Sequence, residues 1–154
     1  MAAPQDPSPN EAFRARLSRE LRDVGVSAFN QDHRSMLGAI LNFHELVENL
    51  SRRRPSNTDW RQVDDAMEHL STYASTHFKA EESLMSLHGF PGLEEHRREH
   101  EAFVQRLAVF RQEVRTRNIL VTVDVKFFLL EWLFTHINQM DYKYADFFRR
   151  KGVS

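Results

Sequence analysis

Apolar side chains at every third or fourth position leave this 154-residue chain little choice but to fold into helices. Only five Gly and five Pro interrupt the pattern, and of the prolines only Pro55 and Pro91 lie inside it. The helices delimited by these breaks are predicted to start near Asn10, at Asn30 or Gln31, at Asn57 or Thr58, near Leu93 and near Thr122. The last three are predicted to end before Gly89, near Arg117 and near Arg150.

Four of these predicted helices are long, the loops between them are short, and almost no segment alternates apolar and polar residues as a strand would. Long helices joined by short loops pack antiparallel to their neighbours. We therefore expect an all-α fold, an up-down-up-down four-helix bundle formed by residues 24–151. Residues 1–23 are expected to form a polar leader and a short amphipathic helix with Phe13, Leu17 and Leu21 on one face.

Composition excludes several classes of function. The chain has no Cys, which rules out disulfides, thiolate nucleophiles, iron–sulfur clusters and zinc fingers, so any metal must be held by nitrogen and oxygen. The net charge of -1 offers no basic excess for nucleic acid to bind. The first residues lack the basic start and apolar run of a signal peptide, and no stretch is apolar enough for membrane insertion, so we expect a cytoplasmic protein.

Histidines and carboxylates stand at ligand-like spacings on the predicted long helices. The candidates are His33, the pairs His77/Glu81 and His96/His100, each four residues apart, and the pair His136/Asp141, five apart. Residues four apart share one helix face, whereas residues five apart lie about 140° apart around an ideal α-helix axis. If neighbouring helices are antiparallel, all seven side chains lie at the same height along the bundle axis. Seven polar groups facing a core are costly to bury unless a metal centre satisfies them.

Five imidazoles and two carboxylates are more than one tetrahedral zinc ion needs, and they suit two octahedral metal ions bridged by carboxylates. Iron is the leading candidate. The ferritin-like di-iron pattern requires Glu-x-x-His on two helices, and no Glu in this chain has a His three residues later. This argues against the carboxylate-rich di-iron oxidases.

The strings around these residues resemble those of the hemerythrins, in particular the bacterial hemerythrin-like proteins. Over about residues 24–150 the matching strings are Gln31-Asp32-His33, His77-Phe78-Lys79-Ala80-Glu81-Glu82 with Leu84-Met85, Gly89-Phe90-Pro91, His96-Arg97-Arg98-Glu99-His100, and Trp132-Leu133-Phe134-Thr135-His136-Ile137 with Asp141 and Tyr144. The resemblance implies a four-helix bundle around two iron ions (Fe2+/Fe3+) that share an oxo or hydroxo bridge and bind O2 reversibly.

The resemblance also implies a role for each candidate residue. It assigns His96, His100 and His136 to one iron, His33 and His77 to the other, and Glu81 and Asp141 to both. The iron with two histidines keeps an open position for O2. The resemblance also implies that the five-residue spacing of His136 and Asp141 is the one that the family uses for these two ligands. Three residues before its first histidine the family commonly has an acidic residue, where this chain has Asn30.

Reversible O2 binding requires a pocket that excludes water and protons. Bulky apolar residues near the candidates in sequence are Met36, Phe78, Trp132, Leu133 and Ile137, which are equally typical of ordinary bundle core. A histidine ligand usually donates its other ring N–H to a nearby acceptor. Asp32, Glu82, Glu99 and Tyr144 are the candidates for such outer contacts, and we select Tyr144. His44, His69 and His88 lie outside the pattern and are expected not to be ligands.

The favoured interpretation is an O2-binding protein for storage, transport or delivery, without catalytic turnover. One alternative is an O2 or redox sensor in which the amphipathic segment 10–22 reports to a signalling partner. Another is a di-iron enzyme with peroxidase or nitric-oxide-related activity. Sequence leaves open whether a signalling or O2-consuming partner protein exists.

Overall fold

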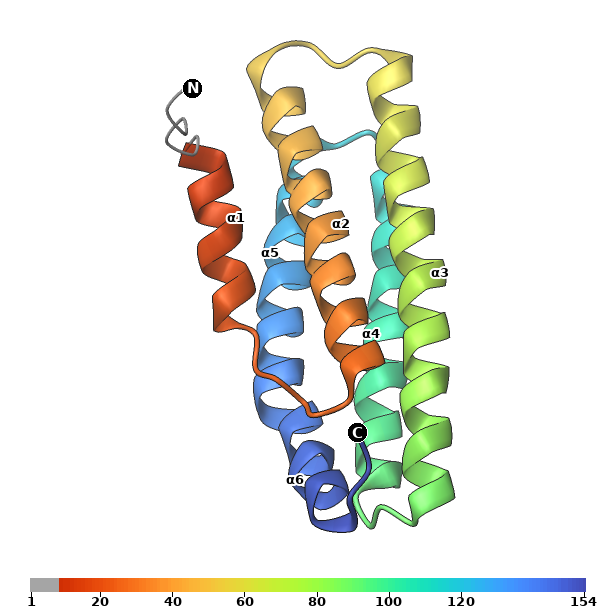
Figure 1. The fold of residues 1–154 in the computed structure, drawn as a ribbon. Helices are drawn as coiled ribbons and strands as arrows, with labels where there is room; N and C mark the ends of the chain where they lie inside the picture. The colour runs from red at the N-terminus through yellow and green to blue at the C-terminus, as the bar shows by residue number, and fades with distance from the viewer. Residues whose placement is uncertain (1–8) are drawn as a thin grey trace, which may run out of the picture.

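The computed structural model describes residues 9–154, and helices form nearly all of this part of the chain (Figure 1). The elements are α1 (Pro9–Glu20), α2 (Ser27–Arg52), α3 (Asn57–His88), α4 (Leu93–Val114), α5 (Ile119–Thr135), a π-helical turn (His136–Asp141) and α6 (Tyr142–Lys151). α2 packs on α3 and α5, and α4 closes the ring by packing on the same two helices. The predicted all-α up-down-up-down bundle is confirmed, with α5, the π turn and α6 together forming its fourth helix. The predicted polar leader over residues 1–8 lies outside the described residues.

Local chemistry fixes where α3 begins and ends. The Ser56 hydroxyl accepts the Asp59 N–H while the Asp59 carboxylate accepts the Ser56 N–H, a reciprocal capping box. At the other end Gly89 adopts the left-handed conformation, with φ of 67°. The helix therefore begins at Asn57 and ends before Gly89, as the sequence predicted, and the residue that caps its start is Ser56.

The start of α2 differs from the prediction. The helix begins at Ser27, and Asn30 lies inside its first turn. The Asn30 side chain accepts the N–H of Val24 at 2.9 Å and donates to Asp23 at 2.7 Å. Asn30 therefore orders the segment before the helix, which explains why a residue typical of helix starts appears three positions late.

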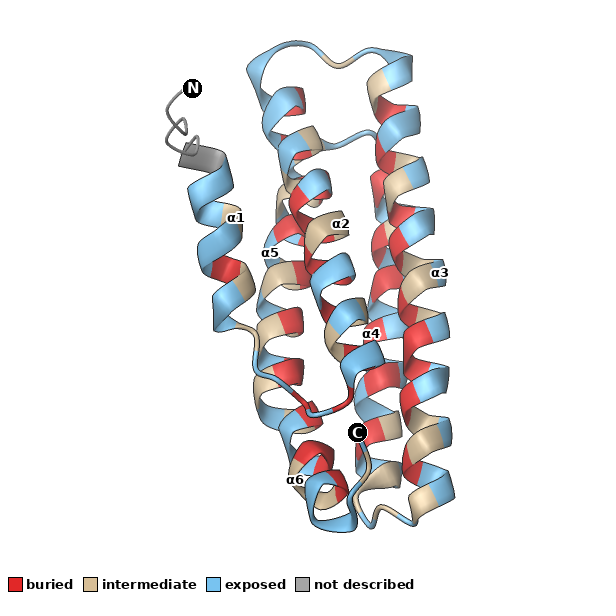
Figure 2. Ribbon diagram, viewed as in Figure 1, coloured by how far each residue is buried: buried red, intermediate tan, exposed pale blue. Residues whose placement is uncertain are grey.

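The core consists of stripes in which buried residues alternate spacings of three and four. In α2 the stripe is Phe29, His33, Met36, Ile40, Phe43, Val47 and Leu50, and in α4 it is His96, His100, Phe103, Leu107, Phe110 and Val114. This is the spacing by which helices pack in left-handed bundles. The buried faces meet along the bundle axis (Figure 2). In these two stripes histidines occupy core positions toward one end of the bundle, and apolar residues occupy the remaining positions.

The predicted continuous helix from Thr122 to Arg150 is wrong in its interior. α5 begins earlier, at Ile119, where Asn118 accepts the Leu120 N–H. Residues His136–Asp141 form a π-helical turn, in which the backbone bonds to the fifth residue along the chain rather than the fourth. A single wide turn changes the apolar pattern too little for periodicity to reveal it.

The short N-terminal helix lies beside the bundle, against α2 (Figure 1). Leu17 is buried, and Arg14 donates to Asn42 and Glu45 of α2. Within residues 9–154 no helix combines the length and the apolar character that crossing a membrane requires.

Candidate metal centre

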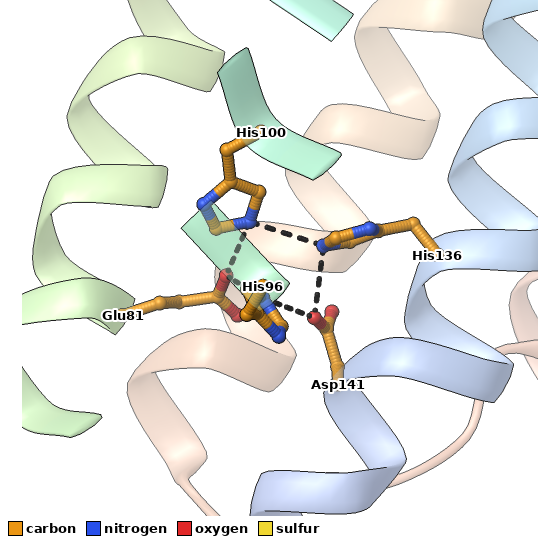
Figure 3. Close-up of side chains that lie close together, drawn as sticks. All are labelled: Glu81, His96, His100, His136 and Asp141. Atoms are coloured by element: carbon orange, nitrogen blue, oxygen red, sulfur yellow. Dashed lines mark hydrogen bonds and ion pairs between the residues drawn. The ribbon is translucent and has the colours of Figure 1, made fainter. Parts of the chain in front are cut away.

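Seven polar side chains converge in the core of the bundle, and they are the seven that the sequence selected. α2 contributes His33, α3 contributes His77 and Glu81, α4 contributes His96 and His100, and the π turn contributes His136 and Asp141. None of the seven is more than 3% exposed. Figure 3 shows five of them facing one another from three sides of the bundle.

Glu81 stands between two groups of histidines. Its Oε1 lies 3.5 Å from Nε2 of His33 and 3.2 Å from Nε2 of His77. Its Oε2 lies 3.6 Å from Nε2 of His96 and 3.3 Å from Nε2 of His100. One carboxylate thus offers one oxygen to each group.

Asp141 repeats this division from the opposite side. Its Oδ2 lies 3.2 Å from Nε2 of His33, and its Oδ1 lies 3.2 Å from Nε2 of His96 and 3.1 Å from Nε2 of His136. The cluster therefore has a two-histidine half, His33 and His77, and a three-histidine half, His96, His100 and His136. Both carboxylates belong to both halves.

The π turn is what brings His136 and Asp141 onto one face. In a regular α-helix five residues would leave their side chains about 140° apart around the axis. A turn closed by an i to i+5 hydrogen bond aligns residues five apart instead. The awkward spacing in the sequence is therefore accommodated by the local backbone.

The charges in this cluster depend on one another. Burial opposes ionisation of Glu81 and Asp141, yet the surrounding imidazoles hold the pKa of each carboxyl below its ordinary value. Burial alone would lower the pKa of His33 and His96, but their contacts with the two carboxylates raise it to about 9. Burial prevails at His136 and lowers its pKa. The two buried carboxylates thus require positive charge beside them, which protons or metal cations can supply.

Unsatisfied atoms in the cluster fit a metal centre. Both oxygens of Asp141, Oε2 of Glu81 and Nε2 of His96 are buried without a hydrogen-bond partner, whereas buried polar atoms in proteins are nearly always paired. Two sets of ligand atoms are close enough to hold an ion: Glu81, His96, His100, His136 and Asp141, and His33, His77 and Glu81. Neither set includes His44, His69 or His88, all of which lie in the part of the chain that the structure describes. Imidazole nitrogens and carboxylate oxygens without sulfur suit several transition-metal ions, iron among them.

Two carboxylates outside the cluster orient histidines in it. Nδ1 of His77 donates to Asp32 at 3.0 Å, and the Tyr73 hydroxyl donates to the same carboxylate at 3.2 Å. Nδ1 of His100 donates to Glu82 at 2.8 Å. Such contacts fix the ring orientation and leave Nε2 facing the cluster. Asp32 follows this rule across helices, because it contacts a histidine of α3 rather than its neighbour in sequence.

Tyr144, selected from the sequence as an outer contact, lies close to the cluster but engages a carboxylate. Its hydroxyl donates to Oε1 of Glu81 at 2.5 Å. Burial, reinforced by the charges of Asp141 and Glu81, raises the pKa of this phenol well above its ordinary value. Tyr144 therefore stays protonated and remains a hydrogen-bond donor.

Aromatic rings cover the three-histidine half. Phe78 stacks on His100 with centroids 3.8 Å apart, and Trp132 stacks on His136 with centroids 4.3 Å apart. Met36, Leu133 and Ile137 are buried in the core, and their part in an O2 pocket stays a prediction. A ring that sequence reasoning missed, Phe29, meets His77 edge-on at 5.7 Å. Its helical spacing of four from His33 was the available signal.

A buried, histidine-rich cluster with two shared carboxylates in a four-helix bundle can hold two metal ions side by side. Residues 24–148 match the family described as the Hemerythrin HHE cation binding domain, and the chain belongs to the hemerythrin family. It is 29% identical over 124 residues to the Bacteriohemerythrin of Stenotrophomonas maltophilia (strain R551-3), covering 80% of this chain and 75% of that protein. It is 23% identical over 125 residues to the Bacteriohemerythrin of Clostridium acetobutylicum, covering 80% and 94%.

Proposed function

We propose that this chain binds O2 reversibly at two iron ions held by His33, His77, Glu81, His96, His100, His136 and Asp141. The observation that carries the proposal is the division of each carboxylate, with one oxygen toward each half of the cluster. That arrangement suits two ions at bridging distance. When bound, the iron pair supplies two electrons that O2 can take up and return. Membership of the hemerythrin family supports the same function.

The two halves are not equivalent, and the two-histidine half is the better site for O2. It presents four ligand atoms: Nε2 of His33, Nε2 of His77, Oε1 of Glu81 and Oδ2 of Asp141. The three-histidine half presents five, because His96, His100 and His136 add three nitrogens to the other two carboxylate oxygens. At a six-coordinate ion fewer protein ligands leave more room for a small molecule.

The surrounding side chains orient the ligands and exclude bulk water from the site. Asp32 and Glu82 hold two imidazoles with Nε2 toward the cluster, and Tyr144 holds Glu81 on the two-histidine side. Burial of all seven side chains keeps bulk water away, which favours release of O2 over release of reduced oxygen species. These features favour binding rather than turnover.

Metal analysis combined with absorption spectroscopy tests the proposal. We expect about two iron ions per chain and a visible band that forms in air and disappears on deoxygenation. One metal per chain, or zinc alone, would contradict the di-iron assignment. O2 should be recovered unchanged on deoxygenation, whereas steady O2 consumption or accumulation of hydrogen peroxide would favour the enzymatic alternative.

A further inference from the structure

One side chain ties the π turn to the segment between α1 and α2. Oδ1 of Asn138 accepts the N–H of Arg22 at 3.1 Å, and its Nδ2 donates to the carbonyl of Glu20 at 3.3 Å. Glu20 is the last residue of α1, so this bond also satisfies a carbonyl that a helix end leaves without an intrahelical partner. A single amide thus engages the backbone of a segment 116 and 118 residues away.

The tethered segment is itself fixed to the bundle. Val24 is fully buried, and its N–H donates to the Asn30 side chain. The Arg22 guanidinium lies 4.5 Å from the ring centroid of Tyr142, the first residue after the π turn. In Figure 1 the segment crosses from the end of α1 to the start of α2 near the junction of α5 and α6. Asn138 therefore joins the π turn to an ordered support.

We propose that Asn138 is a positioning residue for the metal centre, which holds His136 and Asp141 on one face by clamping residues 20–24 onto the π turn. This inference rests on the proposed function. π turns are rare and persist where the surroundings fix them. Relaxation to a regular α-turn would rotate Asp141 by about 100°, which would withdraw a carboxylate from both halves of the cluster at once.

Three full-length variants test the clamp. Asn138→Leu removes both hydrogen bonds and introduces a good helix former. Asn138→Asp keeps the acceptor for the Arg22 N–H and loses the donor to Glu20, so it should rescue part of the effect. Arg14→Ala is the matched control, because it removes the contacts of α1 with Asn42 and Glu45 of α2 and leaves the clamp intact.

Hydrogen exchange of the metal-free chain is the first measurement, because it does not require iron. We expect the amides of residues 137–142 to exchange roughly tenfold faster in Asn138→Leu and roughly threefold faster in Asn138→Asp, as two and one lost hydrogen bonds would give. The Arg14→Ala variant should exchange at the parent rate there. After iron loading, Asn138→Leu should show an altered absorption spectrum and reduced iron content, and Arg14→Ala neither.

Parent-like exchange in Asn138→Leu would overturn the clamp, and so would equal acceleration in Arg14→Ala, which would assign the effect to docking of α1 in general. Faster exchange with an unchanged iron spectrum would overturn the positioning role. If the parent takes up no iron, the proposed function fails, and the exchange measurement alone decides whether Asn138 holds the turn. If Asn138→Leu does not fold, Asn138→Asp against Arg14→Ala gives the same contrast.

Discussion

Tyr144 donates its phenolic hydrogen to Glu81 in a part of the core where neither group can turn to water. Replacing it with Phe leaves a buried carboxylate oxygen with one donor fewer. We expect Tyr144→Phe to lower the free energy of unfolding of the metal-free protein by about 1–3 kcal/mol, measured by urea unfolding. Tyr142→Phe, at an exposed tyrosine two residues earlier, is the control. Equal midpoints for the two variants would contradict the assigned role.

Asp32 and Glu82 act on the proposed metal ions only through the histidines they orient. Removing either carboxylate with Asp32→Ala or Glu82→Ala should weaken metal binding roughly 10- to 100-fold, measured by competition with a chelator. Glu99→Ala removes an exposed carboxylate next to His100 and should leave the affinity unchanged. A comparable loss in all three variants would point to general surface charge instead.

Leu133 is the apolar residue on which the pocket prediction can be tested most cleanly, because Leu129 lies one turn earlier on α5 and is equally buried. Both Leu→Ala variants should lose about 2–5 kcal/mol of stability. Only Leu133→Ala should speed autoxidation of the oxygenated protein, followed by the decay of its visible band. Similar autoxidation rates in the two variants would show that Leu133 does not guard the site.

Single residues also show how far the sequence could predict the site. All seven cluster residues were identified, because their spacings and strings are local. The contacts of Asp32 with His77 and of Glu82 with His100 cross from one helix to another, so only the packed bundle determines them. Phe29 was missed because an aromatic residue at core spacing is usually core alone.

Among the elements, the long helices were predictable and the π turn was not. Apolar periodicity places a helix to within a few residues, as α3 and α4 show. Whether residues His136–Asp141 form an α turn or a π turn is set by contacts between segments far apart in the sequence, and we propose that the hydrogen bonds of Asn138 to residues 20–22 are among them. The family spacing marked the position, but the backbone geometry there is a property of the folded chain.

The capping box of α3 should make the stability of the folded protein depend on pH in the acidic range. The Arg53 guanidinium, together with the Ser56 hydroxyl and N–H, holds the pKa of Asp59 below its ordinary value. A carboxyl with a lowered pKa in the folded state stabilises the protein above pH about 4, and this contribution is lost as the pH falls.

We therefore expect Asp59→Asn to destabilise the protein at neutral pH, by an amount that shrinks on acidification. Urea midpoints at pH 7 and near pH 2 measure the difference from the parent. Asp65→Asn, at an exposed carboxylate on the same helix, is the control, and its difference in urea midpoint from the parent should not shrink as the pH falls. A pH-independent difference for Asp59→Asn would contradict this account.

At the scale of the whole molecule, the core contains Val47, Val63 and Leu107 toward one end of the bundle and the cluster of seven polar side chains toward the other. Bound metal should stabilise the fold by about 2.7 kcal/mol at free metal a hundred times its dissociation constant. Chelation should therefore lower the melting temperature, and backbone amides around the cluster should exchange faster. Reloading with iron is the control, and an unchanged melting curve would contradict metal binding.

Because Glu81 and Asp141 each face both halves of the cluster, the seven positions differ in how a substitution during evolution would affect the site. A substitution at one of the five histidines damages a single half and leaves the other with its full set of donors. A substitution at either carboxylate damages both halves in one step. Substitutions can therefore alter the donor set of one half at a time at the histidine positions, whereas a substitution at Glu81 or Asp141 alters both donor sets together.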